Sequence, residues 1–284
     1  MKFPDFSYAR PTTVTEAIEL LAKNSDARPL AGGQSLLPMM ALRMASPGLL
    51  VDLGSIRELQ GIQESEGELL IGAMTTHDAN ARSPVVARQV PLLREALHHV
   101  AHQAVRNRGT IGGSLANADG SAEMPVVAVA LGAIMSLQGQ HGTRRISAND
   151  FFEGHYTTAI REGELLIHIA FPGNRKTWAF EEVSRRPGDF AIAMAAAGTE
   201  MDGRKCLDAT IVVGGISDRP VKSDDATAFL RGKALDRSVA QHAAQIALEG
   251  VRFRSDIQAD ARFRAKLAKN LVTRALLRAG GVDG

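Results

Sequence analysis

The chain has 284 residues, enough for two or three domains, and 33 Lys and Arg residues nearly balance 31 Asp and Glu residues. The resulting net charge of +2 gives no electrostatic reason to expect nucleic acid or an anionic membrane as a partner, and 45% hydrophobic residues exclude dominant disorder. Cys206 is the single cysteine, so the chain cannot form an internal disulfide and cannot hold an iron–sulfur cluster by itself.

No segment has the pattern of a signal peptide or a membrane anchor. The longest apolar stretch, residues 124–135, is interrupted by Pro125 and Gly132 and is too short to span a bilayer. We therefore expect a cytoplasmic protein without direct membrane insertion.

The first predicted helix begins at residues 13–16, which read Thr-Val-Thr-Glu. This is a capping box, in which the Thr13 hydroxyl and the Glu16 carboxylate satisfy backbone N–H groups at the helix start. The apolar face of the helix would consist of Val14, Ala17, Ile18 and Leu21. With strands expected at 28–31 and 49–53, these residues predict a small β-α-β-like unit.

The second region is predicted to mix strands and helices. We expect strands at 68–73, 133–137, 143–146 and 165–171 and helices at 90–105 and 121–131. The third region begins with strands at 177–184, 190–200 and 207–213, and Asp202-Gly203 indicates a tight hairpin between the last two. Helices are then expected at 224–231, 238–250 and 258–279, and strands followed by helices are typical of an α+β fold.

Two glycine pairs are the main candidates for a binding site. Residues 31–35 read Ala-Gly-Gly-Gln-Ser, and residues 110–114 read Thr-Ile-Gly-Gly-Ser. Successive backbone N–H groups in such turns can form an anion-binding concavity, and the missing side chains let a diphosphate approach. One pair alone is most often a structural turn, whereas two similar pairs indicate one shared phosphate-bearing ligand. Arg106 and Arg108 add positive charge near the second pair.

Other motifs carry less information. No G-x-G-x-x-G follows a strand, and Gly232-Lys233 lacks the rest of a P-loop. His98 and His102 are expected to share a helix face, but a third ligand is not evident, so helix-surface histidines are the preferred interpretation. Residues 185–190 are either an ordinary hairpin loop or a loop that reaches back over a ligand. We assign no catalytic residue and no metal ligand to this chain.

On these motifs the sequence resembles the FAD-binding medium subunits of molybdenum hydroxylases, the carbon monoxide dehydrogenase and xanthine dehydrogenase family. The resemblance covers essentially the whole chain and is carried by residues 31–38, 106–116 and 186–191. It implies a two-part FAD-binding domain of the vanillyl-alcohol-oxidase type, with subdomains at 1–55 and 56–174, followed by a smaller α+β domain at 175–284.

The resemblance also implies which residues contact FAD. The two glycine segments would flank the diphosphate, Asp119 or Glu123 would hydrogen-bond the ribityl or ribose hydroxyls, and Phe190 would lie against the isoalloxazine ring. Some relatives have a lysine near the flavin where this chain has Glu181. The implied cofactor-binding residues are therefore Ala31, Gly32, Gly33, Gln34, Ser35, Thr110, Ile111, Gly112, Gly113, Ser114, Asp119, Glu123 and Phe190.

The function implied is that of an electron-transfer subunit. The molybdopterin and [2Fe–2S] centres would lie on a large and a small partner subunit, since two such clusters need eight cysteines and this chain has one. A dimer of heterotrimers (a heterohexamer) and an external electron acceptor are expected. The alternatives are a self-sufficient FAD-dependent oxidase or reductase and a non-enzymatic nucleotide-binding assembly protein. Carbon monoxide, an N-heterocycle and an aldehyde all remain open as substrates of the complex.

Overall fold

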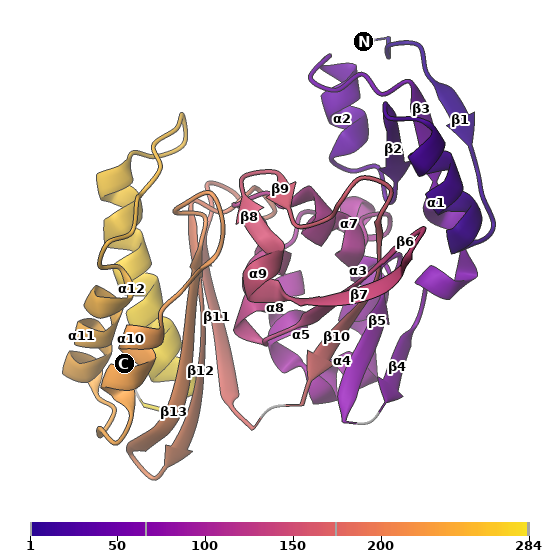
Figure 1. The fold of residues 1–284 in the computed structure, drawn as a ribbon. Helices are drawn as coiled ribbons and strands as arrows, with labels where there is room; N and C mark the ends of the chain where they lie inside the picture. The colour runs from indigo at the N-terminus through magenta and orange to yellow at the C-terminus, as the bar shows by residue number, and fades with distance from the viewer. Residues whose placement is uncertain (1, 66, 174, 283–284) are drawn as a thin grey trace.

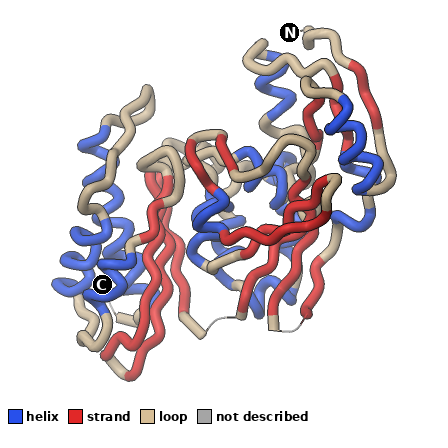
Figure 2. The backbone as a smooth tube through the Cα atoms, viewed as in Figure 1, coloured by secondary structure: helices blue, strands red, loops and turns tan. Residues whose placement is uncertain are grey.

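The computed structural model describes residues 2–65, 67–173 and 175–282, which form three bodies side by side. Figure 1 shows an N-terminal unit at the upper right, a central body, and a C-terminal layer of strands backed by helices at the left. Figure 2 shows that each body combines helices with strands, so the expected α+β class is confirmed. No helix within the described residues is long and apolar enough to cross a membrane.

The N-terminal unit is a parallel sheet of strand order β1-β3-β2. Its elements are β1 (Ser7–Ala9), α1 (Val14–Lys23), β2 (Ala27–Leu30), α2 (Leu36–Ala41) and β3 (Leu49–Asp52). The predicted cap is confirmed, because Thr13 Oγ1 accepts a hydrogen bond from the Glu16 N–H at 3.2 Å. The Glu16 carboxylate accepts from Thr12 N–H at 2.9 Å, one residue before the expected donor. The sequence did not indicate β1 or α2.

The central body contains an antiparallel sheet of order β4-β5-β10-β6-β7. Its strands are β4 (Ile62–Ser65), β5 (Glu68–Gly72), β6 (Ile134–Gly139), β7 (Gly142–Ser147) and β10 (Leu165–Pro172). Two 3-10 turns, η1 (Leu53–Ser55) and η2 (Arg57–Leu59), lead into it, and β8 (Phe152–Gly154) pairs with β9 (Thr157–Thr158). The helices are α3 (His77–Arg82), α4 (Pro84–Gln89), α5 (Pro91–Leu97), α6 (Gln103–Arg106), α7 (Ile111–Asn117), α8 (Glu123–Ala130) and α9 (Ala148–Phe151).

One predicted helix of the central body was wrong. The expected helix at 90–105 is broken, since α5 ends at Leu97 and α6 begins at Gln103. Ala101 lies between them with a φ of +41°, a left-handed conformation that a helix cannot contain. The Arg106 guanidinium donates to the carbonyl oxygens of Val100 and Ala101 at 2.7 Å and so stabilises the break. The spacing of apolar residues continues through the break, so the sequence pattern gave no sign of it.

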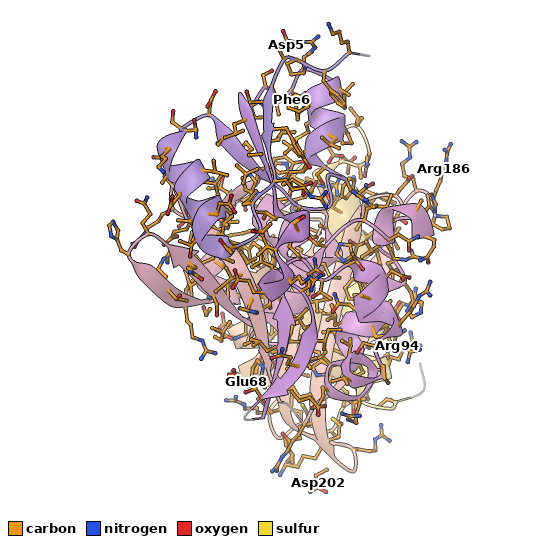
Figure 3. All side chains as sticks on the ribbon, turned by 90° about the vertical axis from the view of Figure 1, so that its right-hand side faces the viewer. Asp5, Phe6, Glu68, Arg94, Arg186 and Asp202 are labelled. Atoms are coloured by element: carbon orange, nitrogen blue, oxygen red, sulfur yellow. The ribbon has the colours of Figure 1, made fainter. Side chains whose placement is uncertain are left out.

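The C-terminal body is an antiparallel sheet of order β11-β12-β13-β14 covered by three helices. The strands are β11 (Thr177–Val183), β12 (Ala193–Asp202), β13 (Lys205–Gly214) and β14 (Val221–Lys222), and the helices are α10 (Asp224–Leu230), α11 (Arg237–Ala247) and α12 (Ala261–Ala279). The Asp202-Gly203 hairpin is confirmed, with Gly203 at φ +55° and Asp202 at the lower tip of the sheet in Figure 3.

Both faces of this C-terminal sheet are buried, which explains the apolar run in β12. Met194 and Ala196 belong to the core shared with the central body, whereas Ala195 and Ala197 pack toward α11 and α12. Val126 of α8 approaches the sheet so closely that a Cβ on Gly214 would lie 2.3 Å from its methyl group. The sheet therefore joins the C-terminal body to the central one through a continuous core.

Candidate functional site

A cleft of about 920 Å³ lies where the three bodies meet. The N-terminal unit contributes Arg28 and residues 31–36, the central body contributes much of 109–123, and the loop before β12 contributes Gly188 to Phe190. Its volume is at the upper end of the range of about 300–1,000 Å³ that is usual for small-molecule sites. Segments far apart in the sequence thus form the walls of one site.

The first glycine segment connects β2 to α2, and all of residues 31–35 line the cleft. Gly33 has a φ of +73°, a conformation that favours glycine. The backbone N–H groups of residues 32–35 have no acceptor within the described parts of the chain. Consecutive unpaired donors at a turn with one left-handed residue are suited to an anion such as a diphosphate.

The second glycine segment is the first turn of α7 rather than an open loop. Thr110 caps this helix by accepting from Gly113 N–H at 3.0 Å, and the N–H groups of Ile111 and Gly112 donate to Thr75 and Ala73 carbonyl oxygens. The expectation that both segments offer free backbone donors was therefore wrong for residues 111–113. Its glycines instead let the start of α7 pack closely against Ala73, since a Cβ on Gly112 would lie 2.5 Å from the Ala73 side chain.

The two glycine segments touch each other. A Cβ on Gly32 would lie 2.1 Å from the carbonyl oxygen of Arg108, and a Cβ on Gly113 would lie 3.2 Å from Cβ of Ala31. Larger residues at these positions would separate the N-terminal unit from the central body. The expectation that both pairs serve one site is consistent with this contact.

Carboxyl groups gather at the end of the cleft formed by residues 119–123. Glu123, the first residue of α8, is 6% exposed, and burial together with the nearby Glu182 charge raises its pKa to about 8. Burial also raises the pKa of Glu182, on β11, to about 7, and Glu182 Oε2 has no hydrogen-bond partner among the described residues. Near pH 7 Glu123 is therefore protonated and can donate a hydrogen bond into the cleft.

Asp119 lies beside Glu123 and is held from two sides. Its Oδ2 accepts from the Tyr156 hydroxyl at 3.0 Å, and its Oδ1 accepts from Ser121 N–H at 2.9 Å. Asp119 and Tyr156 both line the cleft. The carboxylate is thus fixed in orientation before any ligand enters.

Phe190 lies in the loop between β11 and β12 and is 53% exposed at the cleft. This loop rests on the break between α5 and α6, since a Cβ on Gly188 would lie 2.9 Å from the His102 ring. Arg186 of the same loop projects away from the molecule at the right of Figure 3. Because residues 188–190 line the cleft, the structure favours, of the two interpretations of residues 185–190, a loop that reaches back over the cleft.

The charged residues around the cleft differ from the expected set. Neither Arg106 nor Arg108 lines it, because the Arg106 side chain is used to hold the loop at Val100 and Ala101. Arg28 of β2 lines it instead. Glu181 does not, because its carboxylate pairs with Arg274 at 2.8 Å and Arg278 at 3.2 Å on α12.

His77 is a cleft residue that the sequence did not indicate. It begins α3, is 4% exposed, and its ring lies where a Cβ on Gly109 would be 3.0 Å away. Burial and the nearby Arg106 charge lower its pKa to about 4, so the imidazole is neutral. Its Nδ1 has no hydrogen-bond partner among the described residues.

The expectation that His98 and His102 share a helix face was wrong. His98 follows the end of α5, and His102 precedes the start of α6, so the break at Ala101 separates them. Within the described residues, no three His, Cys, Asp or Glu side chains cluster as a metal site requires.

The cleft gathers almost all the residues implied by the resemblance. Ile111 is the exception, because its side chain is buried in the central core. The residues that line the cleft are Ala31, Gly32, Gly33, Gln34, Ser35, Thr110, Gly112, Gly113, Ser114, Asp119, Glu123 and Phe190.

Comparisons with known proteins show which family the chain belongs to. A family model described as the FAD binding domain in molybdopterin dehydrogenase matches residues 4–174, and one described as the CO dehydrogenase flavoprotein C-terminal domain matches residues 178–279. The chain belongs to this family. The resemblance seen in the sequence is thereby confirmed, and the chain is a FAD-binding medium subunit of the molybdenum hydroxylase type.

Relatives in this family match over nearly the full length. The chain is 40% identical to the carbon monoxide dehydrogenase medium chain of Afipia carboxidovorans, with 96% of each chain covered. It is 35% identical to the nicotine 6-hydroxylase medium subunit of Paenarthrobacter nicotinovorans, with 99% of each covered. A chain of quinoline 2-oxidoreductase from Pseudomonas putida 86 superposes with a TM-score of 0.97 at 48% identity, covering 99% of both. These relatives are oxidoreductase subunits, and so is this chain.

Sequence reasoning missed Arg28, His77, Tyr156 and Glu182. His77 follows Thr76, whose side chain caps α3 by accepting from Ala79 N–H, and this cap was the available local signal. Glu182 alternates with the paired Glu181 along β11 and therefore faces the opposite side of the sheet. Only the assembled fold shows that this side is the one near Glu123.

Proposed function

We propose that this chain binds one FAD non-covalently in the cleft. As a subunit of a molybdenum hydroxylase complex, it would transfer electrons from the complex to an external acceptor. The observation that carries the proposal is the contact between the two glycine segments along one wall of the cleft. The backbone donors of residues 32–35 are unpaired within the described chain, and they suit a diphosphate. Residues 1–55 and 56–174 would form the two parts of the FAD domain, and residues 175–284 the third domain.

Each binding residue would act on a different part of the cofactor. The N–H groups of residues 32–35 would hold the diphosphate, and Gly112 and Gly113 would let it approach the start of α7. Asp119 would accept, and Glu123 would donate, hydrogen bonds at the hydroxyls of the ribityl or ribose groups. Phe190 would cover one face of the isoalloxazine ring and exclude water. Bound FAD supplies the ability to accept electrons singly and to pass them on.

The partners follow from what this chain lacks. Cys206 is the single cysteine of the chain and is buried, and [2Fe–2S] clusters need several thiolates. We propose that the clusters lie on a small subunit and the molybdopterin on a large one, in a dimer of heterotrimers. An external acceptor would take electrons from the flavin.

The test has two stages. Acid precipitation of the purified protein should release FAD into the supernatant, whereas FMN or flavin retained in the pellet would contradict the proposed cofactor chemistry. The flavin of the isolated chain should be bleached by dithionite but not by carbon monoxide, quinoline or an aldehyde under anaerobic conditions. One of these substrates should bleach it when the partner subunits are present. Bleaching by a substrate in the isolated chain would instead favour a self-sufficient flavoenzyme.

A further inference from the structure

Residues of the C-terminal domain contact the end of the cleft that contains Asp119 and Glu123. Arg264, in the first turns of α12, is 0% exposed and is the largest fully buried side chain among the described residues. A buried guanidinium is costly unless its donors are paired. Its partners therefore show what it stabilises.

Arg264 joins two segments that reach the cleft. Its Nη1 donates to the carbonyl oxygen of Ile192, two residues after Phe190, and to that of Gly215 at 2.7 Å. Gly215 N–H in turn donates to the Gly120 carbonyl oxygen at 2.8 Å, directly beside Asp119. One side chain thus connects the loop that carries Phe190 with the turn that carries Asp119.

A second arginine contacts the same turn. Arg254 lies between α11 and α12, where its N–H donates to the Ile216 carbonyl oxygen at 2.9 Å and its Nη2 donates to the Ser121 hydroxyl. Ser121 N–H donates to Asp119, so Arg254 acts on the carboxylate through one intermediate residue. Asp256 links the two arginines, with its Oδ1 2.6 Å from Arg264 Nη2 and its Oδ2 3.5 Å from Arg254 Nε.

The turn at residues 118–121 packs so tightly against residues 215–217 that its backbone cannot shift easily. A Cβ on Gly120 would lie 2.9 Å from the Ser217 carbonyl oxygen, and Ala118, just before Asp119, has a φ of +48°. A left-handed alanine persists only where the surroundings hold it. The turn at 118–121 is therefore held by contacts with residues 215–217 and 254 and by the Tyr156 hydroxyl.

We propose that Arg254 and Arg264 are positioning residues for the cofactor: they fix the Asp119 turn and the Phe190 loop from the C-terminal domain, although neither lines the cleft. The inference rests on the proposed binding of FAD. It means that the third domain orients the cofactor as well as covering it.

The test uses Arg254→Met and Ser121→Ala, which remove the donor and the acceptor of one hydrogen bond at the edge of the network. After removal of the flavin, each variant should bind FAD about 10-fold more weakly than the wild type. The visible-region circular dichroism of the bound flavin should also change. The double variant should bind no more weakly than the weaker single variant, because both changes remove the same contact.

Two further variants complete the test. The planar guanidinium of Arg264 bonds to two carbonyl oxygens and to Asp256 at once. Arg264→Lys keeps the positive charge, but a single ammonium group cannot make all of these contacts. This variant should therefore change the same dichroism signal. Arg274→Met, on the same helix and paired with Glu181, is the control and should leave FAD affinity and dichroism unchanged.

The outcomes separate this inference from the proposed function. If Arg254→Met and Ser121→Ala lower only the unfolding temperature of the cofactor-free protein, with FAD affinity and dichroism intact, the arginines are structural and the inference is wrong. If Arg264→Lys does not fold, the Arg254 and Ser121 variants decide. A wild-type protein that binds no FAD would refute the proposed function, and this inference with it.

Discussion

Replacement of Gly32 by alanine tests the contact between the two glycine segments. The new Cβ would lie 2.1 Å from the Arg108 carbonyl oxygen and 2.8 Å from Cα of Gly109, both backbone atoms that cannot rotate away. Ordinary contact begins near 3.4 Å, so the N-terminal unit must move by about 1 Å relative to the central body. Overpacking of this kind costs about 1–3 kcal/mol.

The overpacking occurs where the two glycine segments form one wall of the cleft. We therefore expect its free-energy cost to weaken cofactor binding. A loss of about 1–3 kcal/mol corresponds to FAD binding weakened about 5- to 150-fold. Flavin fluorescence titration of the cofactor-free protein measures this, and thermal unfolding checks the fold. Gly154→Ala is the matched control, because the nearest atom to its Cβ would lie at 3.7 Å. Wild-type affinity in folded Gly32→Ala protein would show that the contact does not shape the site.

The buried Glu123 and His77 and the half-exposed Phe190, which all line the cleft, give further measurable effects. Burial raises the pKa of Glu123 from 4.5 to about 8, so the folded protein keeps a proton that the unfolded chain loses, and its contribution to stability falls as the pH rises through this range. Urea unfolding of Glu123→Gln between about pH 5 and pH 8 should show a flatter pH dependence than the wild type, and parallel curves would contradict the buried neutral acid. Burial lowers the pKa of His77 from 6.5 to about 4, so stability should fall as the pH drops through that interval. His77→Gln should remove that fall in the same assay, and an unchanged acid limb would mean that another group causes it. Phe190→Ala removes a half-exposed ring, so the unfolding temperature of the cofactor-free protein should change little while FAD affinity drops and the flavin dichroism changes. The control is Leu207→Ala, because Leu207 on β13 is exposed to a similar extent. Equal effects of Phe190→Ala and Leu207→Ala would argue against contact between the Phe190 ring and the flavin.

Elements whose signals are local could be predicted from the amino-acid sequence. The Thr13 cap and the Asp202-Gly203 turn act within a few residues, and both occur as predicted, although Glu16 accepts from Thr12 N–H instead of Thr13 N–H. The glycine pairs also predicted two segments that meet at one cleft, because glycine lets two backbones approach closely. Local rules failed at residues 98–102, where the apolar spacing continued through a break that Arg106 stabilises by bonding to Val100 and Ala101.

The difference between the two glycine segments comes from their tertiary contacts. The first keeps its N–H groups unpaired within the described chain, whereas the second donates to Ala73 and Thr75 of the central body. The proximity of Glu123 to Glu182, and the reach of Arg264 to Ile192 and Gly215, likewise join residues distant in the sequence. Such contacts depend on how sheets and helices pack, and no local pattern encodes them, because packing is fixed by the shapes of both partners.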